Sequence, residues 1–251
     1  MYDIAKKLAS AYTVDVQCDI SDLTVIPQQN IMLGETAYEI IERAARFSAV
    51  LVYEGRDGVL ILSRASYLAM SSGVQEGVNM ESAGVERSMD QRYSEVTAVM
   101  IGTNNLMDLN AVGQPAYTSI DVNVPRHRRR IIISESGELG WSVGKQRADW
   151  EVARRAGRSE VLHVVVDNWR DVGGNIWEPN KLIDVLIPSL KVSKGPGGLE
   201  PVRYLISEVT LSLSEAGTHA ELTLMTPDAF KPQPILIQNL YPELAIPAPR
   251  Q

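Results

Sequence analysis

Cysteine and histidine are scarce in this chain. It has one cysteine, Cys18, among 251 residues, and its three histidines, His127, His163 and His219, lie far apart in the sequence. A single cysteine excludes an intrachain disulfide framework and a multi-cysteine metal site, and the histidines lack the spacing of metal ligands. We therefore expect no metal and no cofactor.

Long apolar runs are also missing. No stretch approaches the roughly 20 consecutive apolar residues of a transmembrane helix, and residues 1–12 are too polar for the core of a signal peptide. The chain has 31 acidic and 24 basic residues, a net charge of −7, and 45% apolar residues. This balance excludes a long disordered chain. It predicts a soluble globular protein with one large or two small domains.

Residues 1–88 have the pattern of a small α+β domain. Apolar residues spaced three and four apart predict a helix over residues 3–12, and alternation predicts a strand over residues 14–20 with Cys18 on its apolar side. We interpret Cys18 as a small core residue, because a reactive thiol needs a nearby cation or a helix start.

The second half of this domain has a clear helix start and a hairpin. Thr36 and Glu39 have the spacing of a capping box, which predicts that a helix begins between them. Residues 49–54 and 59–64 are apolar segments on either side of Gly-Arg-Asp-Gly, which predicts two antiparallel strands. We expect residues 66–92 to be a polar connection with irregular or paired extended stretches.

Residues 89–232 are predicted to be mostly β, with one helix inserted near residues 145–157. Strands are expected where apolar residues alternate or form short runs: 96–102, 117–124, 130–134, 161–169, 182–187, 202–206, 209–213 and 220–224. The last two predict a long antiparallel hairpin with one apolar face. The predicted fold is α+β: a small α/β module, then an antiparallel β-barrel with the inserted helix. Residues 233–251 are proline-rich and predict an extended tail.

One motif suggests catalysis. Residues 140–144 read Gly-Trp-Ser-Val-Gly and fit the G-x-S-x-G pattern, which would make Ser142 a nucleophile with His219 and Asp167 or Asp184 as partners. Against this, no strand leads directly into the motif and no alternating βα series precedes it. A glycine-rich loop before a helix is the simpler interpretation, and a serine hydrolase remains the alternative.

A second motif is the basic run from Arg126 to Arg130. Guanidinium groups suit phosphate binding, but no aromatic residues interleave with this run and the chain as a whole is acidic. We interpret the run as a strand end or subunit contact, with DNA binding as a third hypothesis. The four tryptophans are expected to be core or interface anchors.

A stretch in the second half resembles a known family. Residues 174–185, Gly-Asn-Ile-Trp-Glu-Pro-Asn-Lys-Leu-Ile-Asp-Val, resemble the baseplate hub protein of Mu-like contractile-tailed phages, a relative of the hub portion of VgrG spike proteins. Other segments agree in order: Gly34–Glu39, Arg92–Ser94, Val124–Arg126, Ile131–Ile133, Arg147–Glu151, Arg154–Arg155, Gly217–Leu224 and Pro227–Phe230. The resemblance covers about residues 2–232.

The resemblance implies a structural role and no enzymatic activity. Hub proteins of this family form a homotrimer at the tail axis, in which two β-barrels per subunit build a pseudo-sixfold ring between tail tube and spike. The family has a further barrel before the helix that starts this sequence. We therefore expect that the sequence is a piece of a longer protein or that another chain supplies that barrel.

The resemblance also sets the expected partners and location. These are a second and third copy of the chain, the tail tube and the spike, in the virion after assembly in the host cytoplasm, with no membrane. DNA would pass the acidic lumen without specific binding. The candidate structural or interface residues are Trp150, Trp177, Pro179, Asn180, Arg126, Arg128, Arg129 and Arg130.

Overall fold

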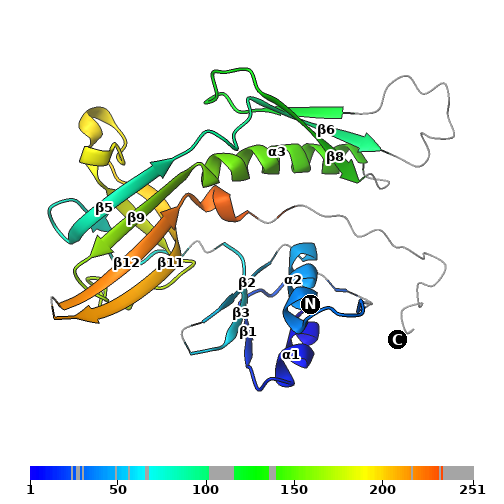
Figure 1. Cartoon of the computed structure of the whole chain (residues 1–251), viewed down its shortest axis with the longest axis horizontal. Helices are drawn as coiled ribbons and strands as arrows, with labels where there is room; N and C mark the ends of the chain where they lie inside the picture. The colour runs from blue at the N-terminus through cyan, green and yellow to red at the C-terminus, as the bar shows by residue number, and fades with distance from the viewer. Residues whose placement is uncertain are drawn as a thin grey trace.

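The computed structural model describes residues 1–23, 25–26, 29, 31–48, 50–55, 57–65, 68–101, 116–135, 140–215, 217–231 and 233. This part of the chain forms three α-helices and three β-sheets. Figure 1 shows a small N-terminal unit beside a curled sheet, and a long helix, α3, that runs from this sheet to a separate layer of strands. The predicted mixed α+β class is confirmed.

The N-terminal unit packs two helices against a three-stranded sheet. Its elements are α1 (Tyr2–Ser10), β1 (Val16–Cys18), α2 (Ala37–Phe47), β2 (Leu51–Glu54) and β3 (Leu60–Ser63). The strand order is β1-β3-β2, with β1 parallel and β2 antiparallel to β3. Ala5, Ile41, Ala44 and Leu62 are buried between the layers, and half-buried Cys18 packs against them, as predicted.

The capping box at the start of α2 is confirmed. The Glu39 backbone N–H donates to Thr36 Oγ1 at 3.3 Å, and the Thr36 N–H donates to the Glu39 carboxylate at 2.8 Å. The Thr36 N–H also lowers the pKa of the Glu39 carboxyl, because it stabilises the charged form. The helix start is therefore determined by local sequence.

A six-stranded sheet forms the largest part of the molecule. Its strands are β4 (Val74–Gln75), β5 (Met80–Arg87), β9 (Glu160–Val166), β10 (Leu182–Leu186), β11 (Val202–Ser214) and β12 (Gly217–Met225). The order is β4-β10-β11-β12-β9-β5, and every pair except β4 with β10 is antiparallel. Three short 3-10 helices lie near it: η2 (Pro188–Leu190), η3 (Pro196–Gly198) and η4 (Pro227–Phe230).

This sheet is curled. Its outermost strands, β4 and β5, follow each other in the chain and are joined by residues 76–79 alone. Asn79 holds that turn, because its side chain accepts from Gln75 N–H and donates to Gly73 O, both at 3.0 Å. The two outer strands therefore meet at one corner, although the strand order places them at opposite ends.

Residues 66–92, which were expected to be a polar connection with irregular or paired extended stretches, contain the paired strands β4 and β5. Both strands pair with members of the six-stranded sheet. The alternation was too weak to identify β5, whose sequence, Met-Glu-Ser-Ala-Gly-Val-Glu-Arg, has few large apolar residues. Its partner β9 lies more than 70 residues further along the chain.

The core of this sheet is built from alternating apolar residues. Fully buried side chains come from four strands: Leu162, Ile183, Tyr204, Ile206, Leu222 and Leu224. The Tyr204 hydroxyl donates to the carboxylate of Glu160. Burial, together with this hydrogen bond, raises the pKa of Tyr204, so the phenol stays neutral.

The predicted hairpin is confirmed as β11 and β12. Val209 lies opposite Leu222 and Leu211 opposite Ala220, which places the apolar residues of both strands on one face. The two predicted strands 202–206 and 209–213 are one strand, with a bulge between Ile206 and Glu208. A bulge interrupts the alternation without ending the strand.

The third sheet and α3 form a separate layer. The sheet contains β6 (Glu95–Ile101), β7 (Ala116–Ile120) and β8 (Arg129–Glu135) in the order β7-β6-β8, with β6 parallel to β8. The helix α3 (Gly140–Arg158) covers one face, where Val96 and Ala98 are buried. It begins five residues before the predicted start.

At the C-terminal end of this region, η4 packs on the last turns of α3. The predicted tail lies outside the described residues beyond residue 233. Among the helices that the structure describes, none has both the length and the apolar character needed to span a bilayer.

Candidate assembly surfaces

The candidate catalytic residues lie in different layers of the structure. Ser142 is the third residue of α3, which packs on β6, β7 and β8. His219 is on β12, where its Nδ1 lies 2.8 Å from Glu81 Oε2. Figure 1 shows the start of α3 and the β11–β12 turn at opposite ends of the view. The structure therefore gives no support to the hydrolase alternative.

Potential metal ligands do not gather either. Within the described ranges, no group of three or more His, Cys, Asp or Glu side chains is placed to hold a metal ion. Asp184, another residue of the proposed triad, pairs with Arg203 at 2.9 Å, and that contact lowers the pKa of the aspartate. The surfaces of the chain, rather than a cleft, are its candidate functional regions.

The basic run is largely engaged within the chain. Arg128 donates to two backbone carbonyls, Met89 O at 2.9 Å and Asp90 O at 3.1 Å. Arg129 pairs with Glu95 at 2.9 Å. These contacts agree with a structural strand end, and they compete with phosphate binding.

Arg130 and Arg126 complete the run. Arg130 points to α3, where its Nε lies 3.4 Å from the Glu151 carboxylate. Arg126 is exposed in the turn before β8. Arg130 thus contributes to the contact between sheet and helix, while Arg128 and Arg129 bind the segment before β6 and β6 itself.

Three arginine side chains lie around the aromatic side chain of Tyr93, where the third sheet meets α3. The guanidinium groups of Arg128, Arg130 and Arg155 lie 5.1, 5.3 and 5.3 Å from the centre of its ring. Arg155 also donates to the buried carboxylate of Glu151 at 2.7 Å. Cation–π contacts and ion pairs therefore join the sheet to α3.

Next to these three arginines, Arg92 and Asp121 form a buried ion pair. Arg92 Nη2 lies 2.7 Å from Asp121 Oδ2, Arg92 Nε donates at 3.0 Å, and the side chains are 14% and 6% exposed. The sequence prediction missed both residues. Arg92, Tyr93 and Ser94 form one of the segments that carried the family resemblance, which is the signal that marks this region.

The candidate tryptophans are buried anchors. Trp150 on α3 donates from Nε1 to Lys231 O at 2.6 Å, and so attaches the chain after η4 to the helix. Trp177 donates to Asn168 O at 2.9 Å within the core of the six-stranded sheet. Both tryptophans therefore act inside the chain, as core residues with one hydrogen bond each.

Asn180 joins the six-stranded sheet to the N-terminal unit. Its side-chain amide donates to Arg64 O at 3.0 Å and to Tyr53 Oη at 3.3 Å, and its backbone N–H donates to Ile206 O at 2.8 Å. The side chain is 7% exposed and φ is +61°, a conformation that asparagine tolerates better than most residues. Half-buried Pro179 precedes it.

Asn180→Ala is expected to lower the free energy of unfolding by about 2–3 kcal/mol. The variant loses the buried amide, and alanine tolerates the left-handed conformation at this position less well than asparagine does. Asn180→Gly is the matched variant, because glycine adopts this φ freely and loses only the side chain. Urea unfolding measures both. If the glycine variant were as stable as the wild type, Asn180 would not join the two units.

One exposed surface is the face of the third sheet that α3 does not cover. We call it the outer sheet face; its residues are Glu95, Thr97, Val99, Ala116, Thr118, Ile120, Arg129, Ile131 and Ile133. Ile120, Ile131 and Ile133 are 65%, 65% and 71% exposed. Clustered aliphatic side chains on one surface are typical of an interaction site.

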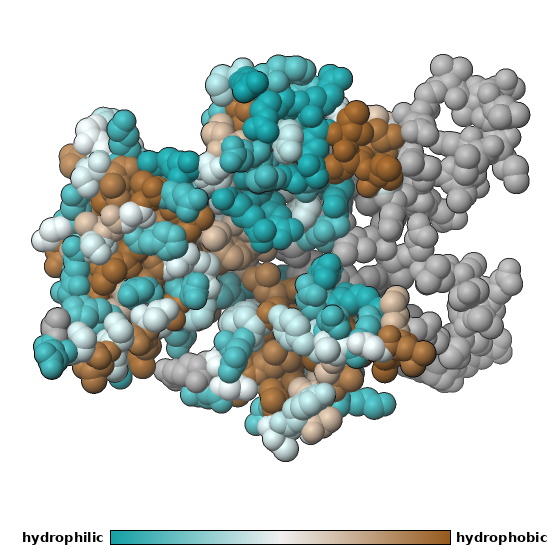
Figure 2. Space-filling model, viewed as in Figure 1, coloured by the Kyte–Doolittle hydropathy of each residue, from teal (hydrophilic) through white to brown (hydrophobic). Residues whose placement is uncertain are grey.

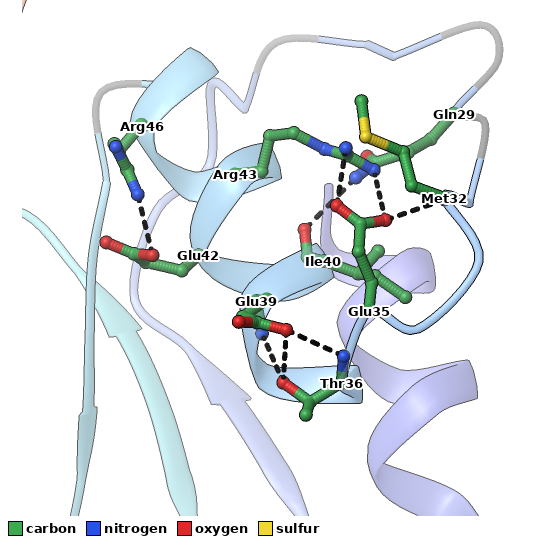
Figure 3. Close-up of polar contacts among 9 residues, drawn as sticks. All are labelled: Gln29, Met32, Glu35, Thr36, Glu39, Ile40, Glu42, Arg43 and Arg46. Carbon is green, nitrogen blue, oxygen red and sulfur yellow. Dashed lines mark hydrogen bonds and ion pairs between the residues drawn. The ribbon is translucent and has the colours of Figure 1, made fainter.

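A second exposed surface is the loop before α2. Ile31, Met32 and Leu33 are exposed one after another, and we call them the apolar tip. Figure 3 shows how this loop is held: Glu35 accepts from the Met32 N–H at 2.8 Å and pairs with Arg43 of α2 at 2.6 Å. Gln29 donates to Ile40 O at 3.0 Å.

An open groove of about 620 Å³ lies beside the apolar tip. Its walls come from the tip and from α2, including Glu39, Glu42, Arg43 and Arg46. Arg46 and Glu42 pair at 2.7 Å across one helical turn (Figure 3). Charges of both signs line the groove, so it does not favour a ligand of one charge.

Two family models match the chain. "Baseplate hub protein gp44-like, second domain" matches residues 1–64, and "Mu phage baseplate assembly protein GpP, fourth domain" matches residues 141–233. Baseplate hub protein gp44 of Escherichia phage Mu is 29% identical over 220 residues, which are 84% of this chain and 56% of that protein. This chain resembles the Mu-like baseplate hub proteins. The resemblance predicted from the sequence is thereby confirmed.

Two solved structures of tail proteins share the fold. The 43 kDa tail protein of prophage MuSo2 from Shewanella oneidensis has a TM-score of 0.75 at 23% identity, covering 92% of this chain and 65% of that one. The tail protein from Neisseria meningitidis MC58 has a TM-score of 0.71 at 19% identity, covering 92% and 68%. The chain thus spans little more than half of its curated hub relative and about two thirds of these structures.

The two exposed surfaces differ in how they relate to the hub domains. The apolar tip lies within the region matched by the gp44-like second domain. The outer sheet face lies between the two matched regions.

Proposed function

We propose that this chain is a structural component of a phage tail baseplate, in the central hub that joins tail tube to spike. The observation that carries the proposal is the match of two hub-protein domains, in order, to one chain. The identity to gp44 and the fold shared with prophage tail proteins support it. The role is mechanical, with no catalysis and no cofactor.

In this proposal the chain acts as a ring of three copies. The curled six-stranded sheet, whose outer strands meet at residues 76–79, would be the barrel that each copy contributes to the wall of the tail passage. A closed ring covers exposed strand edges and transmits load through subunit contacts. Trp150, Trp177, Pro179 and Asn180 would keep each copy rigid.

The partners in this proposal are the tail tube and the spike, and the location is the virion, after assembly in the host cytoplasm. DNA passes the lumen without specific binding, which the net charge of −7 supports because like charges repel. The engagement of Arg128, Arg129 and Arg130 within the chain also favours this over a DNA-binding role.

The domain division is part of the proposal. Residues 1–88, 89–232 and 233–251 were predicted as small domain, barrel domain and tail. The pairing of β4 and β5 with β10 and β9 supports a first boundary near residues 65–68 instead. The small domain would then end after β3.

Light scattering of the purified chain tests the ring. We expect a mass three times the 27.7 kDa of one chain. A monomer at every concentration would contradict the ring.

A serine-directed covalent probe tests the structural role itself. If the probe labelled the wild type but not Ser142→Ala, the chain would be a hydrolase and the structural role would be contradicted.

A further inference from the structure

The helix α3 and the strands β6, β7 and β8 form a body with a core of its own, which we call the arm. Val96 and Ala98 on β6 and Ala148 on α3 are buried, and the helix packs on all three strands. Among the residues that the structure describes, the buried cluster of the six-stranded sheet contains no side chain from the arm. Figure 2 shows mainly hydrophilic residues over the arm, with hydrophobic ones at the end away from that sheet. Two bodies without a shared apolar core can move relative to each other.

Two segments connect the arm to the six-stranded sheet: residues 88–94 between β5 and β6, and Ser159 between α3 and β9. They lie side by side, because the Ser88 N–H donates to Ser159 O at 2.9 Å. Next to this bond Arg87 pairs with Glu160 at 2.5 Å, and their side chains are 43% and 26% exposed. Water can replace such polar, partly exposed contacts at little cost. A few residues at the ends of regular elements are typical of a hinge.

The 3-10 helix η4 crosses the same junction. It follows β12 in the chain and packs on the last turns of α3, where Ala229 is 1% exposed. Gly157 permits this close approach, because a β-carbon there would lie 2.3 Å from the Ala229 backbone nitrogen. Trp150 Nε1 then donates to Lys231 O at 2.6 Å. η4 therefore ties the six-stranded sheet to the arm through a buried contact.

We propose that the arm turns about Ser88 and Ser159, and that η4 is the strap that holds it at the angle in Figure 1. While η4 is in place, turning the arm would pull Ala229 off α3 and expose a buried contact. A partner that bound η4 would change the position of the arm, since a ligand shifts a conformational equilibrium toward the state that it binds better. This inference goes beyond the proposed function and concerns a single copy of the chain.

Distances between two spin labels test the hinge. In a Cys18→Ala background, one label is attached at Ile133→Cys on the arm and the other at Val172→Cys, on the turn between β9 and β10. These positions are 71% and 89% exposed. Labelled chains are diluted with unlabelled chains, so that each distance is measured within one copy. Double electron–electron resonance should give a single narrow distance when the strap is intact.

Two strap variants should release the arm. Gly157→Ala forces Ala229 away from α3, and Trp150→Phe keeps an aromatic ring but removes the donor to Lys231 O. For both variants we expect a broader distribution with a shifted mean in place of the narrow distance, because the arm then adopts several angles. Gly84→Ala is the matched control, since a β-carbon there has no atom within 4 Å, and it should keep the narrow distance.

A second label pair separates a turning arm from a loosened fold. Leu213→Cys, 72% exposed on β11, and Val172→Cys both lie outside the arm and should keep a narrow distance in every variant. Broadening of both label pairs in the strap variants would contradict the hinge, and so would an arm distance that both variants leave unchanged. A broad arm distance with the strap intact would show that η4 does not hold the arm. Because each distance lies within one copy, a monomer in light scattering would contradict the ring and leave the hinge in place.

Discussion

Asp121→Asn is expected to lower the free energy of unfolding by about 3 kcal/mol. The substitution removes the charge that balances Arg92 but keeps the size of the side chain, so no cavity forms. Since the Arg92 and Asp121 side chains are only 14% and 6% exposed, the guanidinium group would remain buried without a counter-ion. Urea unfolding at neutral pH measures the loss.

Asp184→Asn is the matched control. Asp184 also binds an arginine through two oxygens, Arg203 at 2.9 and 3.1 Å, but these side chains are 47% and 58% exposed. Water replaces the lost contact at such a site, so we expect a loss below about 1 kcal/mol. Equal losses in the two variants would show that burial does not determine the effect at Asp121.

Gly157→Ala is expected to destabilise the protein by about 2–3 kcal/mol. Alanine usually stabilises a helix by about 1 kcal/mol relative to glycine, so the sign here is opposite to that expectation. A β-carbon at Gly157 would lie 2.3 Å from the backbone nitrogen of Ala229, which forces η4 away from α3. Urea or thermal unfolding detects the change.

Gly84→Ala is the control for this prediction. Gly84 lies in β5, and a β-carbon there has no atom within 4 Å. We expect no loss, or a small gain, because alanine has less freedom in the unfolded chain. If Gly157→Ala were as stable as Gly84→Ala, the close approach of η4 to α3 would not contribute to stability.

Local signals predicted much of the fold. The start of α2 followed from Thr36 and Glu39, which cap the helix without help from the rest of the chain. The β11–β12 hairpin followed from strict alternation across a short turn. The partners lie 3 residues apart in the capping box and at most 20 apart in the hairpin, so the local sequence pattern contains both interactions.

The start of α3 and the strands β4 and β5 were not identified, because their stabilisation is not local. The first five residues of α3 include Gly140, Ser142 and Gly144, which have low helix propensity, and so the predicted helix began at residue 145. β4 and β5 have little apolar alternation, and they are stabilised by pairing with β10 and β9. Tertiary contacts decide the structure in both cases.

The candidate functional residues also divide into what the sequence could identify and what depends on contacts between distant residues. Composition and resemblance identified Trp150, Trp177 and Asn180 as structural, which agrees with their burial. The three acceptors of the Asn180 amide lie more than 110 residues away, so its role between two units could not be read from the sequence. The arginine run was visible, but its partners Tyr93 and Glu151 were not.

The curl of the six-stranded sheet sets the sequence of events during synthesis. Val74 pairs with Val185 and Arg87 with Glu160, so the two strands made first have no partner until much later residues leave the ribosome. Closing such long loops slows folding. The first two strands of this sheet to be made thus wait for β9 and β10, and the whole sheet is complete only when β12 has been translated.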